Sequence, residues 1–259
     1  FKLQKTVIDR RIKVMQAEGI TFKTNTPVDV EKLPAGYDAY YICTGTPTAR
    51  DLKVPGRDLK GVHFALELLS QQNRVLAGQT FSAKERVTAK GKRVLVIGGG
   101  DTGSDCIGTS HRQGAVSVTQ IEIMPKPPVG SNPNTPWPQW PVVLKTSSSH
   151  EEGCERRWLL TTNKFIGTKD NRVCGAEVEE VEWKPNPDGG RPIMVPTGKK
   201  ETIECDIVFL AMGFLRPEQP KFAENVFVAG DAATGASLVV RCIAGGRKAA
   251  QQIDAYLSK

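Results

Sequence analysis

A run of glycines directly follows a short apolar stretch of the sequence. Residues 93–97 predict a strand buried on both faces, and the turn Gly98-Gly-Gly-Asp-Thr-Gly103 leads into a helix expected to end near Gln113. In such a unit the first glycine permits the tight turn, the second lets a diphosphate approach the backbone, and the third lets the helix pack on the strand. The helix N-terminus then faces the phosphate charge. The alternative is a glycine-rich turn without a ligand. The predicted dinucleotide site consists of Gly98, Gly99, Gly100, Asp101, Thr102 and Gly103.

The residues after the next predicted strand, Val116 to Ile123, bear on which nucleotide binds. Glu122 stands near its end, where an acidic side chain usually accepts a hydrogen bond from a ribose 2′-hydroxyl and so favours NADH. Lys126 follows closely and Arg112 lies near the end of the helix, so a cationic pair could face the extra phosphate of NADPH. Strand alternation does not say which way Glu122 points. We predict NADPH, with Lys126 as the first choice for the phosphate contact.

A second candidate site lies near the end of the chain. Asn225 to Ala229 predict a short strand that ends in Gly230-Asp231, and residues 237–257 predict a helix. A carboxylate at the end of a strand and beside a helix N-terminus is well placed to accept hydrogen bonds from a sugar or sugar-alcohol hydroxyl. An aspartate that caps the following turn is an equally good interpretation of Asp231.

Other chemistries find little support. Ser147 to Ser149 stand beside His150, but the chain has no GxSxG motif, so we expect a surface loop there and not a hydrolase site. The six cysteines are at least 20 residues apart and never form CxxC, which predicts reduced, mostly buried thiols and disfavours thioredoxin-reductase chemistry. The three histidines share no metal-ligand spacing, so no metal site is predicted. No tyrosine stands in a YxxxK arrangement, which disfavours a single-domain dehydrogenase.

The remaining pattern alternates strands and helices and favours an α/β fold. Outside the two sites, helices are predicted over residues 5–18 and 62–72, and strands over 20–23 and 39–43. A β-meander is predicted from residues 157–166, 172–183 and 203–210. Residues 125–141 hold seven of the 17 prolines, which predicts an ordered loop or surface wrap.

Composition describes a globular protein of one or two domains. The chain has 259 residues, of which 39% are apolar and 24% charged, and it shows neither a membrane-spanning run nor a signal peptide, so we expect a cytoplasmic protein without a membrane partner. The net charge is +7, with a surplus of basic residues between Arg50 and Arg93. This surplus favours dinucleotide phosphates over nucleic acid, against the alternative of a solvated basic face. Because the chain begins at Phe1, we expect that an upstream part of a longer polypeptide is absent.

Six motifs together resemble the small (β) subunit of glutamate synthase. These motifs are Gly98 to Gly103, Gln120 to Pro128, Pro136 to Pro141, Ser147 to Gly153, Ala211 to Phe214 and Val228 to Ala232. The resemblance spans nearly the whole chain and implies an adrenodoxin-reductase-like FAD/NAD(P)H oxidoreductase. The implied architecture is a Rossmann-like FAD/NAD(P)-binding fold (three-layer β/β/α) with a β-meander. It implies an NAD(P)H-binding domain at residues 48–210, inserted into a partial FAD-binding domain made of residues 1–47 and 211–259.

The resemblance also implies cofactor contacts and departures from the family pattern. Met212 and Gly213 would join the NADPH residues, and the FAD residues would be Thr44, Gly45, Gly230, Asp231, Leu238 and Val239. The family's N-terminal iron–sulfur domain and first FAD-binding βαβ unit precede the residues matched here. We therefore expect a fragment that retains little FAD and has no turnover of its own. Only ten residues separate Phe214 from Asn225, where the family carries a longer stretch.

The function implied for the parent protein is electron input. It would pass hydride from NADPH to FAD, and electrons on to iron–sulfur clusters and a large subunit that makes glutamate from glutamine and 2-oxoglutarate. One alternative is a related NAD(P)H-dependent flavin oxidoreductase that feeds another acceptor. Another, for the fragment, is a nucleotide-binding or docking module without turnover.

Overall fold

The computed structural model describes residues 2–130, 133, 143–218 and 220–259, in two compact units. Unit 1 contains residues 1–48 and 214–259, and unit 2 contains residues 49–213. Unit 2 is therefore an insertion into the sequence of unit 1. Which cofactor each domain binds stays a prediction, and the motif Pro136 to Pro141 lies outside the described residues.

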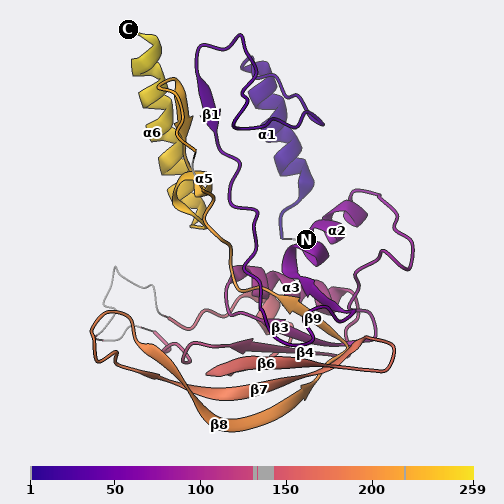
Figure 1. The fold of residues 1–259 in the computed structure, drawn as a ribbon. Coiled ribbons are helices and arrows are strands. Elements are labelled where there is room, and N and C mark those ends of the chain that lie inside the picture. Colours follow the sequence, from indigo (N-terminus) through magenta and orange to yellow (C-terminus); the bar gives the residue numbers. More distant parts are fainter. Residues whose placement is uncertain (1, 131–132, 134–142, 219) are drawn as a thin grey trace. The chain divides into compact units, whose positions relative to one another are not determined.

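A five-stranded parallel sheet forms the centre of unit 2 (Figure 1). In spatial order its strands are β2 (Val62–Phe64), β9 (Ile207–Leu210), β3 (Arg93–Ile97), β4 (Ser117–Glu122) and β5 (Glu155–Trp158). All neighbouring strands run parallel, so their carboxyl ends meet at one edge of the sheet. The glycine turn follows the central strand β3 at that edge, which is where open α/β sheets bind ligands.

Different layers cover the two faces of this sheet. The helices over one face are α2 (Ala65–Leu76) and α3 (Asp101–Arg112). Val94 and Val96 of β3 belong to the core on the helix side, whereas Leu95 and Ile97 belong to the core on the other side. This alternation is what a strand buried on both faces requires. The predicted three-layer β/β/α fold is confirmed.

The third layer is an antiparallel sheet of three strands. They are β6 (Leu160–Gly167), β7 (Val173–Lys184) and β8 (Ile193–Glu204), with β7 in the middle. Ala176 and Val178 of β7 are fully buried against the parallel sheet, whereas most of β8 is exposed. The layer therefore buries its inner face on the parallel sheet and presents its outer face to solvent.

Unit 1 combines a two-stranded parallel sheet with helices. Its elements are α1 (Lys5–Ala17), β1 (Tyr40–Ile42), β10 (Val226–Val228), α5 (Asp231–Thr234) and α6 (Val239–Leu257). Strand β1 pairs with β10, so that Tyr41 lies opposite Phe227. Phe227 also contacts Tyr256 of α6 edge to face, with 5.9 Å between the ring centroids. The predicted strand at 39–43 and helix at 237–257 are confirmed to within two residues.

Two elements predicted in the first third of the chain were wrong. The segment 62–72 does not begin as a helix, because Val62 to Phe64 pair with β9 and the helix starts only at Ala65. The Glu67 side chain then accepts a hydrogen bond from the Phe64 amide at 3.1 Å, which caps that helix. The predicted strand at 20–23 is absent. Ile20 and Phe22 are each 44% exposed and have no ladder partner among the described residues.

The predicted β-meander was also wrong in part. The segment 203–210 is not one strand, because β8 ends at Glu204 and β9 begins at Ile207 in a different sheet. Asp206 separates them and accepts hydrogen bonds from the Arg93 amide at 2.9 Å and its guanidinium at 2.8 Å. Most of β8 was not predicted, since its exposed residues show no apolar alternation. Residues 155–158, in contrast, join the parallel sheet as β5.

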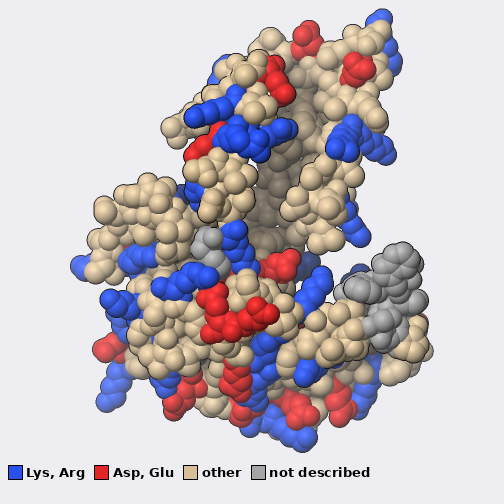
Figure 2. Space-filling model, turned by 180° about the vertical axis from the view of Figure 1, so that it is seen from behind, with Lys and Arg blue, Asp and Glu red and all other residues tan. Residues whose placement is uncertain are grey.

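Charges of both signs are mixed on the face of the molecule that Figure 2 presents. Basic and acidic side chains lie side by side there, so this face does not carry charge of a single sign. Within the predicted basic stretch, Arg57 pairs with Asp51 at 2.6 Å and Arg93 pairs with Asp206. In the described part of the chain, no helix is long and apolar enough to cross a membrane.

Candidate functional site

The glycine turn after β3 has the geometry that its spacing predicts. Gly98 has φ +119°, and a Cβ there would overlap the carbonyl of Ala211, lying 2.7 Å from the carbonyl carbon. A Cβ at Gly103 would overlap the Gly98 carbonyl, so this residue allows α3 to approach the strand. Gly100 is the N-cap of α3, and a Cβ there would meet no atom within 4 Å. The backbone at Gly100 is therefore open to a ligand.

Glu122 closes against this turn from the end of β4. Its Oε2 accepts a hydrogen bond from the Gly99 amide at 2.5 Å, and its Oε1 accepts one from the Met124 amide at 3.2 Å. The sequence left open which face Glu122 takes. In the structure the carboxylate turns toward the helix side, where backbone amides hold both oxygens.

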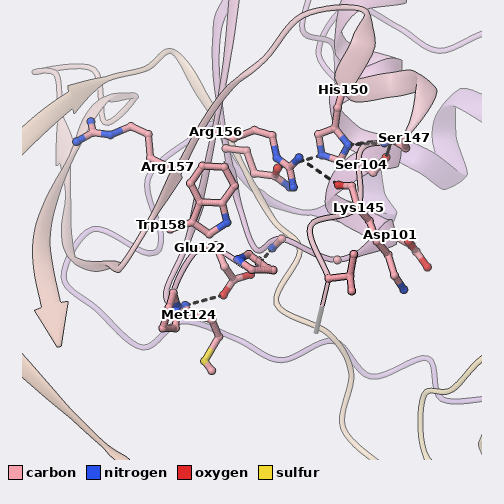
Figure 3. A pocket seen from close by; sticks show the side chains of 16 residues that line it. Asp101, Ser104, Glu122, Met124, Lys145, Ser147, His150, Arg156, Arg157 and Trp158 are labelled. Atoms are coloured by element: carbon pink, nitrogen blue, oxygen red, sulfur yellow. Dashed lines mark hydrogen bonds between the residues drawn. The ribbon is translucent and has the colours of Figure 1, made fainter. Parts of the chain in front are cut away.

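A cavity of about 320 Å³ opens beside the turn (Figure 3). Residues at the carboxyl edge of the parallel sheet, the first turn of α3 and the crossover before β5 line it. They include Gly99, Gly100, Asp101, Ser104, Gln120, Glu122, Met124, Lys145, Ser147, His150, Arg156 and Trp158. The described lining contains no residue between Arg50 and Arg93, so the basic stretch predicted to attract phosphate lies elsewhere.

A buried hydrogen-bond network supports the cavity floor. The short helix α4 (Ser148–Glu151) follows Ser147, whose hydroxyl lies 2.5 Å from that of Ser104. His150 Nδ1 accepts a hydrogen bond from the Ser147 amide at 3.1 Å, and its Nε2 lies 3.2 Å from Gln120 Oε1. Gln120 Nε2 in turn donates to the Gly98 carbonyl at 2.8 Å. The network thus runs from the first glycine of the turn to the first turn of α3.

This network corrects the surface loop predicted for Ser147 to Ser149. Ser149 is fully buried, and Ser147 and His150 border the cavity (Figure 3). The sequence signal was weak, because adjacency of serine and histidine says nothing about what each side chain contacts. His150 Nδ1 also lies 3.0 Å from the Ser147 hydroxyl, and its Nε2 faces Gln120, so this serine–histidine contact belongs to the capping of α4.

The cations near the cavity differ in their partners. Arg157 turns away and its guanidinium donates to Glu201 at 3.0 Å, whereas Arg156 points into the cavity (Figure 3). Lys126 lies over the Trp158 ring, with 5.1 Å from Nζ to the ring centroid. Arg112 is at the opposite end of α3 from the glycine turn, where it pairs with Glu152 at 2.6 Å. The structure therefore does not bring Arg112 into the cavity.

Three of the residues that shape this site were not predicted from the sequence: Arg156, Trp158 and Lys145. The first two stand on β5, which pairs with β4 so that Arg156 lies opposite Gln120 and Trp158 opposite Glu122. Only the parallel register reveals these neighbours. An alternation of side chains on residues 155–158 was the one signal that could have suggested them.

The second candidate site lies within unit 1. Gly230 has φ +65°, and Asp231 Oδ1 accepts hydrogen bonds from the Ser237 hydroxyl at 2.7 Å and the Cys242 thiol at 3.2 Å. A cavity of about 370 Å³ borders Gly230 and Ser237. Leu238 and Val239 are 55% and 74% exposed. In the same unit, Gly45 follows Thr44 and has φ +74°. The hydroxyl of the next residue, Thr46, donates a hydrogen bond to the Leu215 carbonyl.

Comparison with known proteins identifies the family. The model of the pyridine nucleotide-disulphide oxidoreductases matches residues 2–134, which is more than half of the chain. The chain belongs to this family. Its match covers β3, the glycine turn and β4, whereas the cavity residues from Lys145 to Trp158 lie beyond it.

Close relatives carry the names that the six motifs predicted. The chain is 42% identical to the "Glutamate synthase [NADPH] small chain" of Mycobacterium tuberculosis, over 99% of this chain and 58% of that protein. It is 34% identical to "Glutamate synthase [NADH]" of Saccharomyces cerevisiae, over 99% of this chain and 14% of that protein. The predicted resemblance is confirmed, and the chain spans 58% of the length of the first of these relatives. That alignment covers 287 positions, so the relative has residues without a counterpart among the 259 here.

A solved structure supports the fold. FprA of Mycobacterium tuberculosis in complex with NADPH matches with a TM-score of 0.62, over 86% of this chain and 63% of that chain. The identity is 16%, so this likeness concerns the fold alone.

Proposed function

We propose that this chain is the nucleotide-binding part of a cytoplasmic glutamate synthase small chain. In the whole protein it passes hydride from NADPH to FAD. Electrons continue through iron–sulfur clusters to a large subunit that makes glutamate from glutamine and 2-oxoglutarate. The proposal is supported by the relative in Mycobacterium tuberculosis, whose name includes NADPH and small chain, and by the family's name.

The open backbone at Gly100 is the observation that carries the proposal for unit 2. A diphosphate that approaches there meets no side chain and faces the amides at the N-terminus of α3, a helix of 12 residues. The cavity beside the turn extends to Glu122 and Trp158, so an adenosine can continue from the diphosphate along the sheet edge. The residues present thus fit a dinucleotide.

The proposed contacts follow from these positions. The turn from Gly98 to Gly103, with Asp101 and Thr102 on its helix, holds the diphosphate. Lys126 is the first choice of the sequence analysis for the 2′-phosphate, and its place beside Trp158 supports it. Met212 and Gly213 follow β9, next to β3, at the same edge of the sheet, which suits the nicotinamide half.

For unit 1 we propose FAD contacts at Thr44, Gly45, Gly230, Asp231, Leu238 and Val239. The cavity at Gly230, the carboxylate of Asp231 and the exposure of the two apolar residues suit a ribityl chain and a ring system. The nicotinamide and flavin supply the hydride chemistry when bound, and the protein orients them and excludes water.

The experiment for unit 2 is a titration of NADPH into wild type, Gly100→Val and Gly114→Val. Valine at Gly100 enters the space assigned to the diphosphate. The same side chain at Gly114, just past the other end of α3, meets no atom within 4 Å, and the strain of its φ of +85° is reported by the unfolding temperature. We expect Gly100→Val to lose NADPH binding and Gly114→Val to keep it, with both checked for folding by thermal unfolding. Equal affinity in a folded Gly100→Val protein would remove the site assignment.

A further inference from the structure

Arg156 carries a positive charge into the cavity, and no carboxylate among the described residues pairs with it. Its guanidinium NH1 donates to the Lys145 carbonyl at 3.1 Å, and its Cζ lies 5.2 Å from the centroid of Trp158. Its Nε is buried and has no hydrogen-bond partner among the described residues. Burial lowers the pKa of this guanidinium from its ordinary value. A buried, unpaired charge is costly, so this geometry suits an anion from outside the chain.

Neighbouring arginines do not share this property. Arg157, the next residue on β5, turns to the other face of the sheet and pairs with Glu201. Arg93 pairs with Asp206, and Arg112 pairs with Glu152. These three guanidinium groups have their counter-charge within the protein.

The register places Arg156 beside the part of the cavity that we assign to the adenosine. Arg156 stands opposite Gln120, and Trp158 stands opposite Glu122, on the helix-side face of β4 and β5. An acidic residue at the position of Glu122 normally repels a 2′-phosphate. Here both oxygens of the Glu122 carboxylate accept hydrogen bonds from backbone amides, one from Gly99 and one from Met124. These hydrogen bonds offset part of the negative charge and hold the carboxylate against the backbone.

We propose that Arg156 is the residue that selects NADPH over NADH, by binding the 2′-phosphate with its guanidinium group. Lys126, whose ammonium group lies over the Trp158 ring, adds charge but no planar fork. Arginine binds phosphate through two parallel hydrogen bonds, which gives a directional contact that a lysine ammonium lacks. This inference rests on the proposed dinucleotide site.

The test measures equilibrium affinities for NADPH and NADH in four proteins: wild type, Arg156→Gln, Arg157→Gln and Lys126→Ala. Arg157→Gln is the charge control, because Arg157 also borders the cavity but its guanidinium is already paired with Glu201. Glutamine keeps much of the arginine's length, and thermal unfolding checks each variant. Arg156→Lys, which keeps the charge, serves as a second variant if Arg156→Gln does not fold.

We expect wild type to prefer NADPH. Arg156→Gln should weaken NADPH binding by about tenfold to a hundredfold, the usual range for a hydrogen bond to a charged group, and leave NADH binding nearly unchanged. Arg156→Lys should lose part of this preference, and Arg157→Gln should retain it. Rising salt should narrow the difference between the affinities for NADPH and NADH in wild type but not in Arg156→Gln.

Several results would overturn the inference. An Arg156→Gln protein that keeps the wild-type preference, or that weakens both nucleotides equally, would exclude Arg156 as the selecting residue while the dinucleotide site remains. Loss of the preference in Lys126→Ala alone would assign the role to Lys126. If wild type bound neither nucleotide, the proposed site itself would fall, and the inference with it.

Discussion

Replacing Gly98 by alanine should destabilise unit 2 more than the same replacement at Gly100 or Gly114, where the added methyl group meets open space. Gly98 has φ +119°, a conformation that costs an alanine about 1–2 kcal/mol. The added Cβ would also lie 2.7 Å from the carbonyl carbon of Ala211, on the backbone that continues β9. Because this neighbour is backbone and not a flexible side chain, overpacking should add about 1–3 kcal/mol. The expected loss is about 2–5 kcal/mol in the free energy of unfolding.

Two other glycines separate these contributions. Gly114→Ala has φ +85° but no atom within 4 Å of the new Cβ, so it should show the conformational cost alone, about 1–2 kcal/mol. Gly100→Ala has φ −83° and open space, so it should cost at most about 1 kcal/mol, the difference between glycine and alanine at an N-cap. Urea unfolding followed by circular dichroism measures all three. A Gly98→Ala protein as stable as Gly114→Ala would refute the close approach of the turn to β9.

Three further outcomes follow from other contacts. Arg93 lowers the pKa of Asp206, so their pair stabilises the folded state at neutral pH and is lost as acid protonates the carboxylate. Asp206→Asn should cost about 1 kcal/mol at neutral pH, because the pair is partly exposed, and its difference from wild type in urea unfolding should shrink below about pH 4. His150→Ala releases the Gln120 side chain from one of its contacts, so the affinity for NADPH should fall while the unfolding temperature stays close to that of wild type. Calorimetry can measure both quantities. A maleimide should label the exposed Cys43 before Cys106, whose burial raises its pKa, and mass spectrometry of digested protein would reveal the reverse order.

Local patterns predicted the part of the fold that local forces determine. The apolar run at 93–97, the glycines after it and the helix that follows specify a strand-turn-helix unit with little help from the rest of the chain. The same holds for α6, whose pattern is long and regular. Residues 62–64, in contrast, became a strand because β9 offers them hydrogen bonds, and no local propensity reports that partner.

The candidate site was predictable only where it is local. The turn from Gly98 to Gly103 and Glu122 belong to one contiguous unit, so their spacing carried the prediction. Arg156 and Trp158 reach the same cavity because β5 pairs with β4. The sequence of the long connection between these strands does not predict which residues of β5 lie opposite which residues of β4. Arg112 shows the converse, because closeness in sequence placed it at the wrong end of its helix.

Hydrogen–deuterium exchange with and without NADPH tests the central claim most directly, since it maps the bound nucleotide onto the intact chain. We predict that NADPH slows exchange of the amides at residues 98–104, at the N-terminus of α3, and at residues 156–158 on β5, with little change in β8. Protection confined to unit 1, or no protection at the glycine turn at nucleotide concentrations that saturate binding, would contradict the assignment of the dinucleotide site to the carboxyl edge of the parallel sheet.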